Sequence, residues 1–328
     1  MKLVNFTADG AAHRLGALVD DGRTIVDLQM AAEGRWNRSD PAFASVLALI
    51  EADDDGLARA YDALRGAGAG ARRDRASVAL LAPIQPAVQI RDSLCFEEHL
   101  KNAFAQGRRV RARSYPDPEA ALREMEEKNI LAVPQVFYEQ PIYYKANRFA
   151  VTGTDRDVEW PAYSNLMDFE LEFGCYIKKP ARNVRKEDAR DYIFGYTIFN
   201  DFTARDAQMT EMLGQLGPAK GKDFDTGNAM GPCLVTADEL SDPYNLKMTA
   251  RVNGEVWGGG NSSSMHWSFE DLIAHISRSE TLHPGEFLGS GTVGTGCGLE
   301  LGRFLAPGDV VELEVEGIGV LRNRIVKR

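Results

Sequence analysis

One short segment constrains the fold of this chain most: the run MDFELEF, residues 167–173, alternates apolar and acidic side chains. Successive side chains of a β-strand point to opposite faces, so Asp168, Glu170 and Glu172 would share one face. A row of carboxylates is typical of a solvated sheet face or of a hard-metal site, because adjacent carboxylates repel unless water or a cation separates them. Taken alone, the alternation favours the solvated face of an antiparallel strand.

The same β pattern recurs along the chain. From Tyr143 to the C-terminus, apolar and β-branched runs alternate with turn signals, and the helices predicted between them are short. The first 30 residues also form short alternating segments, separated by turns at residues 8–10 and 20–22. We therefore predict a mostly β (α+β) fold built from mixed, largely antiparallel sheets.

Helical spacing appears between these β-rich parts. The sequence predicts helices over residues 41–64 and 92–106. Between them, the glycine-rich basic run GAGAGARRDR, residues 66–75, indicates an exposed linker. We place a small N-terminal β-rich domain at residues 1–85 and a larger, catalytic domain at residues 86–328.

Composition narrows the function classes. Lys and Arg number 38 against 48 Asp and Glu, a formal charge of −10, which disfavours nucleic acid or membrane partners and favours a small-molecule substrate. No apolar run approaches a membrane span, and the first residues lack a signal-like pattern, so we expect a cytoplasmic protein. The 5 histidines and 4 cysteines show no zinc-like spacing, so any metal site must use oxygen ligands.

Four further segments carry polar residues that a plain β fold does not need. Asp92 and His99 are seven residues apart, so on one helix they would face the same side and could meet one cavity. In FNDFTARDAQ a strand runs into a helix beside Asp201, Arg205 and Gln208, although helix capping and a structural ion pair explain these residues equally well.

The other two segments are loops. GPAKGKDFDTGNAMGP is rich in glycine, and its Lys222 could supply positive charge to an anionic substrate; it lacks the ending of a nucleotide-phosphate loop, so ATP is not implied. LGSGTVGTGCGLELG offers Thr292 and Glu300, but a threonine beside glycines is most often a turn residue.

Taken in order, these motifs closely resemble the fumarylacetoacetate hydrolase superfamily. The resemblance extends over about residues 88–328 and includes MDFELEF, GYTIFNDFTARDAQ, GKDFDT, TLHPGEFLGSGTVG and APGDVVELEVEGIGVLRNRI. It implies the mixed β-sandwich roll of that family with a less similar N-terminal β domain. By analogy, it also implies a homodimer.

The resemblance implies a divalent cation, with Mg²⁺ first and Ca²⁺ or Mn²⁺ as alternatives. The family's ligand positions correspond here to Glu170, Glu172 and Asp201. Members most similar to fumarylacetoacetate hydrolase itself place another carboxylate seven residues before the catalytic histidine, which implies Asp92 as the fourth ligand. Carboxylates are what hard cations prefer. Asp168 lies outside the family's ligand pair and is interpreted as structural or as supporting a ligand.

The resemblance also implies that His99 is the general base and that Glu300 orients it. Smaller members of the family carry a glutamate three residues after the histidine, whereas this chain has Asn102 there. This difference points to the hydrolase-like branch.

Several residues resemble substrate contacts of the family. Arg205, Gln208 and Lys222 correspond to groups that contact substrate and stabilise oxyanions, and Thr292 to a substrate-contacting threonine. A phenol would come from either Tyr143 or Tyr144, because the alignment is ambiguous by one residue.

One departure concerns the far end of the substrate. Where the family has a tyrosine that contacts the substrate carboxylate, this chain reads Ser93, Leu94 and Cys95, which implies a less polar or differently shaped substrate end. Arg108 either replaces that contact or belongs to a solvated helix end.

These residues predict a metal-dependent hydrolase that cleaves a carbon–carbon bond in a β-diketone or acylpyruvate-type 2-oxo acid, in aromatic or related catabolism. A 2-oxo acid decarboxylase, hydratase or isomerase is the alternative, because the same metal–enolate chemistry serves all of them. The third hypothesis is a metal-binding or scaffold protein without catalytic activity.

Overall fold

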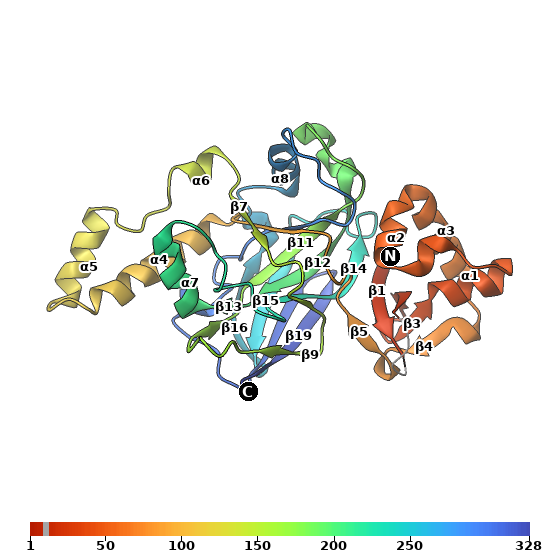
Figure 1. Cartoon of the computed structure of the whole chain (residues 1–328), viewed down its shortest axis with the longest axis horizontal. Helices are drawn as coiled ribbons and strands as arrows, with labels where there is room; N and C mark the ends of the chain where they lie inside the picture. The colour runs from red at the N-terminus through yellow and green to blue at the C-terminus, as the bar shows by residue number, and fades with distance from the viewer. Residues whose placement is uncertain (9–12) are drawn as a thin grey trace.

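The computed structural model describes residues 1–8 and 13–328, so the turn predicted at residues 8–10 lies largely outside the described residues. A large sheet runs through the middle of the molecule, with a helix-rich N-terminal part on one side and an arm of helices reaching out on the other (Figure 1). The predicted turn at residues 20–22 is present. In the part of the chain that the structure describes, no helix combines the length and apolar character needed to cross a membrane.

The N-terminal part combines a small antiparallel set of strands with helices. The helix predicted over residues 41–64 forms as three shorter pieces, beginning at Asp40, whose side chain caps the first of them. The segment predicted as an exposed linker at residues 66–75 is mostly exposed, but its residues 72–74 pair with β3 as an edge strand. The elements are β1 (Lys2–Thr7), β2 (Arg14–Val19), β3 (Thr24–Asp27), α1 (Leu28–Trp36), η1 (Pro41–Ala44), α2 (Val46–Glu51), α3 (Asp53–Arg65), η2 (Ala69–Ala71), β4 (Arg72–Asp74), η3 (Arg75–Ser77) and β5 (Ala79–Leu81).

The middle of the chain holds the helical arm. The helix predicted to start at Asp92 begins only at Glu97, because residues 90–93 are a strand paired on both sides. Asp92 and His99 therefore do not share one helix, so the helix predicted to carry both is wrong, although both residues line one cavity as expected. The elements are β6 (Ile90–Ser93), α4 (Glu97–Ala112), α5 (Pro118–Glu127), α6 (Val136–Glu139), β7 (Tyr143–Ala146), β8 (Val151–Thr152) and β9 (Arg156–Glu159).

The remaining chain is mainly β. The predicted strand at residues 167–173 is interrupted, since Glu170 bridges to Cys297 between β10 and β11. The elements are β10 (Met167–Asp168), β11 (Leu171–Ile177), η4 (Lys186–Tyr192), β12 (Ile193–Asp201), β13 (Thr203–Ala204), α7 (Arg205–Glu211), η5 (Met212–Gly214), β14 (Asn228–Thr236), β15 (Lys247–Val252), β16 (Glu255–Asn261), η6 (Ser262–Ser264), α8 (Phe269–Ile276), β17 (Phe287–Gly289), α9 (Gly298–Leu301), β18 (Val310–Val315) and β19 (Gly319–Val326).

Three sheets result. The largest has the order β4-β3-β2-β1-β14-β12-β11-β17-β6-β7, with β5 beside β1 and β8 beside β14. A second sheet has the order β16-β15-β18-β19-β9, and β10 pairs with β13. The N-terminal strands thus continue the large sheet through the β1–β14 pairing, so the division at residue 85 stays a prediction.

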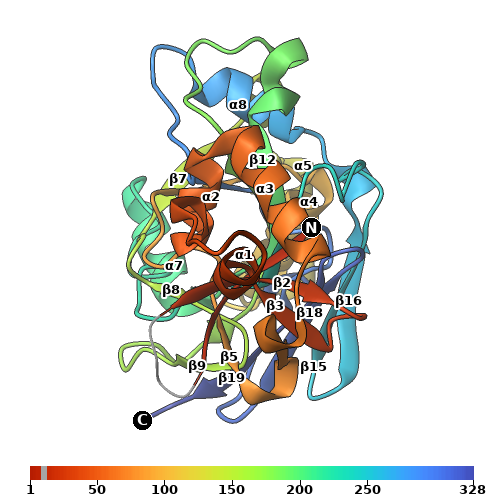
Figure 2. The ribbon, with the colours of Figure 1, turned by 90° about the vertical axis from the view of Figure 1, so that its right-hand side faces the viewer.

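The two faces of the large sheet pack against different layers. One face carries Phe173 and Ile198, which belong to a core shared with the second sheet and with α8. The opposite face carries Tyr176 and Phe199, which pack in a core with the N-terminal helices. Figure 2 shows those helices in front of the sheet strands when the N-terminal part faces the viewer.

The predicted α+β class is confirmed, as mixed sheets with helices. Helix and strand occupy similar shares of the described residues, because the arm and the N-terminal helices balance the β-rich part after Tyr143.

Candidate active site and metal centre

A cavity of about 330 Å³ lies beside the strands β6, β11 and β12, and is closed on its other sides by α4, β7 and α7. Two of the predicted site residues, Arg108 and Glu300, are not part of its lining. The structure brings the others together in it: Asp92, His99, Tyr143, Tyr144, Glu170, Glu172, Asp201, Arg205, Gln208, Lys222 and Thr292.

Three carboxylates form the centre of this cavity. Asp92, Glu172 and Asp201 each offer an oxygen, and these oxygens lie within 4.8 Å of one another. The three residues come from β6, β11 and β12, which the large sheet places almost side by side, separated only by β17. All three are buried, so the solvated face that the alternation alone favoured is excluded for Glu172.

Burial and mutual repulsion disfavour the ionised forms of these groups. Burial, with the Asp201 charge beside it, raises the pKa of Asp92 to about 7. Burial and the Asp92 charge raise the pKa of Glu172 well above its ordinary value, and burial also raises the pKa of Asp201. Such a cluster is costly without a cation nearby.

Two observations indicate that a cation fits here. Glu172 Oε2 and Asp201 Oδ1 are buried and, among the described residues, have no hydrogen-bond partner. Gly289 on β17 lies between the strands of Asp92 and Glu172, and a Cβ at this position would collide with the Asp92 carboxylate. The donors are all carboxylate oxygens, the set preferred by Mg²⁺, Ca²⁺ and Mn²⁺.

Glu170 lies next to this cluster but has a different environment. One of its oxygens accepts a hydrogen bond from Arg205 at 2.8 Å and the other from Lys222 at 2.6 Å. Burial would raise the pKa of Glu170, but these two cations lower it to about 2. Glu170 is therefore an ionised neighbour of the three-carboxylate group, with both oxygens already bonded to protein cations.

Lys222 connects Glu170 to Asp201 of the three-carboxylate cluster. Its ammonium contacts Glu170 at 2.6 Å, Asp201 Oδ2 at 2.6 Å and the Asp201 carbonyl at 3.2 Å. Burial alone would lower the pKa of Lys222, but the Asp201 and Glu170 charges raise it. Lys222 is thus a fixed positive charge beside the cluster.

Asp168 is buried and supports the site from behind. Its carboxylate accepts hydrogen bonds from Arg205 at 2.7 and 3.0 Å, and from the amides of Gly298 and Leu299 at 2.7 and 2.9 Å. It therefore connects Arg205 to the short helix α9, which carries Glu300.

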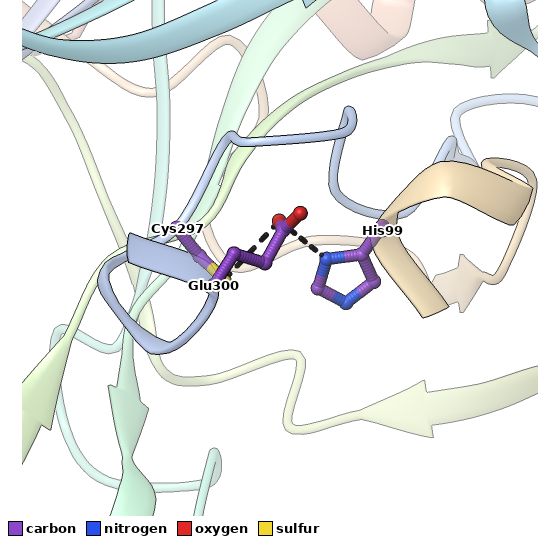
Figure 3. Close-up of side chains that lie close together, drawn as sticks. All are labelled: His99, Cys297 and Glu300. Carbon is purple, nitrogen blue, oxygen red and sulfur yellow. Dashed lines mark hydrogen bonds and ion pairs between the residues drawn. The ribbon is translucent and has the colours of Figure 1, made fainter. Parts of the chain in front are cut away.

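The histidine and its predicted partner meet at the side of the cavity. His99 Nδ1 lies 2.8 Å from Glu300 Oε1, and the Glu300 side chain is 1% exposed (Figure 3). With Nδ1 turned to Glu300, the other ring nitrogen is the one left for a substrate or water.

Sequence reasoning missed how Glu300 is held. Its second oxygen accepts a hydrogen bond from Asn102 at 2.9 Å and from the Thr295 amide at 2.7 Å. The Cys297 thiol lies 3.5 Å from its first oxygen (Figure 3). Asn102 stands three residues after His99, one helical turn along α4. This spacing puts both side chains on one face of the helix and could have indicated that they share a partner.

The remaining predicted substrate contacts surround the cluster. Tyr144 donates a hydrogen bond to Asp201 at 2.6 Å, and Thr292 lies 3.4 Å from Glu172. Gln208 accepts from Arg205 at 2.8 Å, which leaves its amide N–H groups without a partner among the described residues.

Arg108 lies elsewhere. It donates to the carbonyl of Leu131 at 2.7 Å, within the helical arm. Since it does not line the cavity, the structure gives no support for a substrate contact by Arg108.

Comparison with known proteins finds similar sequences and structures that span most or all of the chain. Residues 90–326 match the model of the family described as fumarylacetoacetate (FAA) hydrolase C-terminal. The chain is 32% identical to oxaloacetate tautomerase fahd2, mitochondrial, of Xenopus laevis, over 99% of this chain and 90% of that protein. It is 38% identical to human oxaloacetate tautomerase FAHD2A, mitochondrial, but there the alignment spans only 57% of this chain and 59% of the human protein. Among solved structures, the fumarylacetoacetate hydrolase of Exiguobacterium antarcticum matches with a TM-score of 0.74 and 26% identity over 100% of both chains.

Proposed function

Because this chain belongs to the fumarylacetoacetate hydrolase family, we propose that it is a metal-dependent hydrolase of an acylpyruvate-type 2-oxo acid. The observation that carries this proposal is the contact between His99 and Glu300 beside the three-carboxylate cluster. A base held by a buried carboxylate, next to oxygen ligands for a hard cation, is what water attack on a ketone requires.

The metal would be held by Asp92, Glu172 and Asp201, with Glu170 adjoining. When bound, a divalent cation supplies Lewis-acid stabilisation of the enolate that leaves on carbon–carbon cleavage. The balance of charged side chains supports a cation: Arg205 and Lys222 pair with Asp168, Glu170 and Asp201, and the carboxyl groups of Asp92 and Glu172 lie in the same site without an ion-pair partner among the described residues. We propose Mg²⁺ as the ion, with Ca²⁺ and Mn²⁺ as alternatives.

His99 would take a proton from water as the water oxygen adds to the carbonyl furthest from the 2-oxo acid end. Glu300 holds Nδ1 and stabilises the imidazolium that forms. The bond between the attacked carbonyl carbon and the neighbouring CH₂ carbon then breaks. The CH₂ carbon of the departing enolate takes up a proton, and the products are pyruvate and a carboxylic acid. Arg205 and Lys222 keep Glu170 ionised and in place, and Lys222 also contacts Asp201. The free amide of Gln208 would be a donor for a substrate oxygen.

A second candidate is keto–enol tautomerisation of a 2-oxo acid such as oxaloacetate. It is favoured by the named activity of the Xenopus relative, which aligns over nearly the whole chain. The same imidazole would move a proton between the enol oxygen and the adjacent carbon. Tautomerisation needs no added water, so it places no demand on Glu300 beyond orientation.

The two candidates give different products. Purified protein with Mg²⁺ is incubated with acetylpyruvate and with enol-oxaloacetate, and enol absorbance and product mass are followed. Formation of acetate and pyruvate with one added water supports the hydrolase. Conversion of enol-oxaloacetate to the keto form without any cleavage of acylpyruvates would replace it by the tautomerase. Release of carbon dioxide would contradict both.

We also propose a homodimer in the cytoplasm. Three apolar side chains are exposed, by 50, 84 and 87%: Met212, Leu213 and Leu216. Contact with a second copy of the chain would remove them from water. Light scattering of the purified protein tests the dimer, and fractionation of the source cells tests the location.

A further inference from the structure

We propose that the substrate carries an apolar tail, aliphatic or aryl, beyond its metal-binding 2-oxo acid end, and not a second carboxylate. This inference rests on the proposed function and specifies the class of acylpyruvate. It is carried by two features of the cavity: its outer wall is apolar, and every cation in its lining already has a carboxylate partner.

The outer wall is built by three separate elements. Leu100 and Phe104 come from α4, Ile142 precedes β7, and Met212 follows α7. Leu94 lies in the segment where the family resemblance implies a carboxylate-binding tyrosine. Burying a chain of methylene groups or a ring against such a wall stabilises the complex, whereas burying a carboxylate there without a partner is costly.

The cations in the cavity are already paired with carboxylates of the protein. Lys222 has three contacts, at 2.6, 2.6 and 3.2 Å, which match the three N–H donors of an ammonium group. Arg205 uses Nε and Nη2 on Asp168 and Glu170, and one N–H of Nη1 on Gln208, so four of its five N–H donors are engaged. Among the described lining residues there is no other Lys or Arg.

The polar groups that remain are neutral. The hydroxyl of Ser93 lines the cavity, is buried, and has no partner among the described residues. Tyr143 adds a phenol, and Gln208 its free amide. These groups can bond a ketone oxygen, but they cannot neutralise a carboxylate.

Binding of two acids of equal length tests the inference without turnover. 2-Oxooctanoate and 2-oxosuberate share the 2-oxo acid end and differ only in the far end, which is a methyl group or a carboxylate. In calorimetric titration of the Mg²⁺-saturated protein, the dissociation constant of 2-oxooctanoate should be at least about tenfold lower than that of 2-oxosuberate. Equal or tighter binding of 2-oxosuberate, or no binding of either acid, would overturn the inference.

A pair of neighbouring variants locates the effect. Met212→Arg places a free cation in the apolar wall and should reverse or abolish the preference for 2-oxooctanoate. Leu213→Arg is the matched control, because Leu213 is 84% exposed and does not line the cavity, so it should keep the preference. If both variants behave alike, the wall does not set the preference.

The outcome is separable from that of the proposed function. If 2-oxooctanoate binds tightly but neither hexanoylpyruvate nor acetylpyruvate is cleaved, the hydrolase proposal fails and the tail assignment stands. If acylpyruvates are cleaved but fumarylpyruvate is cleaved with a higher kcat/KM than hexanoylpyruvate, the tail assignment fails and the hydrolase stands.

Discussion

His99 Nδ1 lies 2.8 Å from Glu300 Oε1, although 201 residues separate the two in the chain. The pair is formed by tertiary packing of α4 against the short helix α9, and Asn102 and the Thr295 amide fix the second oxygen of Glu300. A base of this kind exists only when the arm helix is seated against the rest of the molecule.

Glu300→Gln should lower kcat on an acylpyruvate by about 10²–10⁴-fold, because the amide cannot stabilise the imidazolium that forms on His99. The Mg²⁺ affinity should change little, since Glu300 is not a member of the three-carboxylate cluster and does not line the cavity. Steady-state kinetics and Mg²⁺ titration measure the two effects. Asn102→Ala is the control: it leaves the Glu300 carboxylate in place and should lower kcat less than Glu300→Gln does. Near-native turnover of Glu300→Gln would exclude the assigned dyad.

Glu172→Gln should abolish the stabilisation of the protein by Mg²⁺. A ligand at a hundred times its dissociation constant stabilises the folded state by about 2.7 kcal/mol, or a few degrees in Tm for a chain of this size. We expect this Mg²⁺-dependent rise in the native protein and its absence in the variant, measured by thermal unfolding with and without EDTA. Glu312→Gln, in the second sheet, serves as the control and should keep the rise. An unchanged rise in Glu172→Gln would show that the cation binds elsewhere.

Asp168→Ala should destabilise the protein by about 3–5 kcal/mol, because it leaves the Arg205 guanidinium buried with one carboxylate partner fewer. Urea unfolding gives the free energy of unfolding. The matched control is Glu255→Ala, which breaks the exposed pair with Arg303 and should lower the free energy of unfolding far less than Asp168→Ala. Equal losses in the two variants would contradict the supporting role of Asp168.

Asp206→Asn should destabilise the protein at pH 7 but not in acid. Burial would raise the pKa of Asp206, yet hydrogen bonds from the Ser164 hydroxyl and from the amides of Asn165 and Ala207 lower it. A depressed pKa in the folded state means that the stabilisation is present above the pKa of the unfolded chain and is lost as pH falls through the folded value.

We therefore expect a difference of about 1–2 kcal/mol between native and Asp206→Asn protein at pH 7, shrinking towards zero near pH 3. Urea titrations in EDTA at the two pH values measure it, with Asp225→Asn on an exposed loop as the control. A difference of the same size at both pH values would mean that the Asp206 charge is not responsible.

The sequence motifs identified the family and located most cavity residues. These motifs lie in or next to β6, β17, β11 and β12, which are neighbours in the large sheet. Local spacing misplaced Asp92, since a seven-residue interval suits a helix, whereas pairing with β17 and β7 holds residues 90–93 extended. Nor does local pattern reveal that Glu170 is bonded to Lys222 and Arg205, because those partners approach from other elements only in the folded chain.

The strand formed by residues 72–74, within the segment expected to be an exposed linker, was missed for a similar reason. Glycine and arginine there signal a solvated segment, but an open edge of β3 is available for pairing, and backbone hydrogen bonds do not depend on side-chain type.

The pairing of β1 with β14 has a practical consequence for dissecting the molecule. β14 also pairs with β12, the strand that ends at Asp201, so deleting residues 1–85 would uncover the apolar edge of β14 at Leu234 and Val235. A shortened chain that begins near residue 86 would therefore tend to associate through that edge. Studies of catalysis are best made on the whole chain, in which the first strand protects this edge.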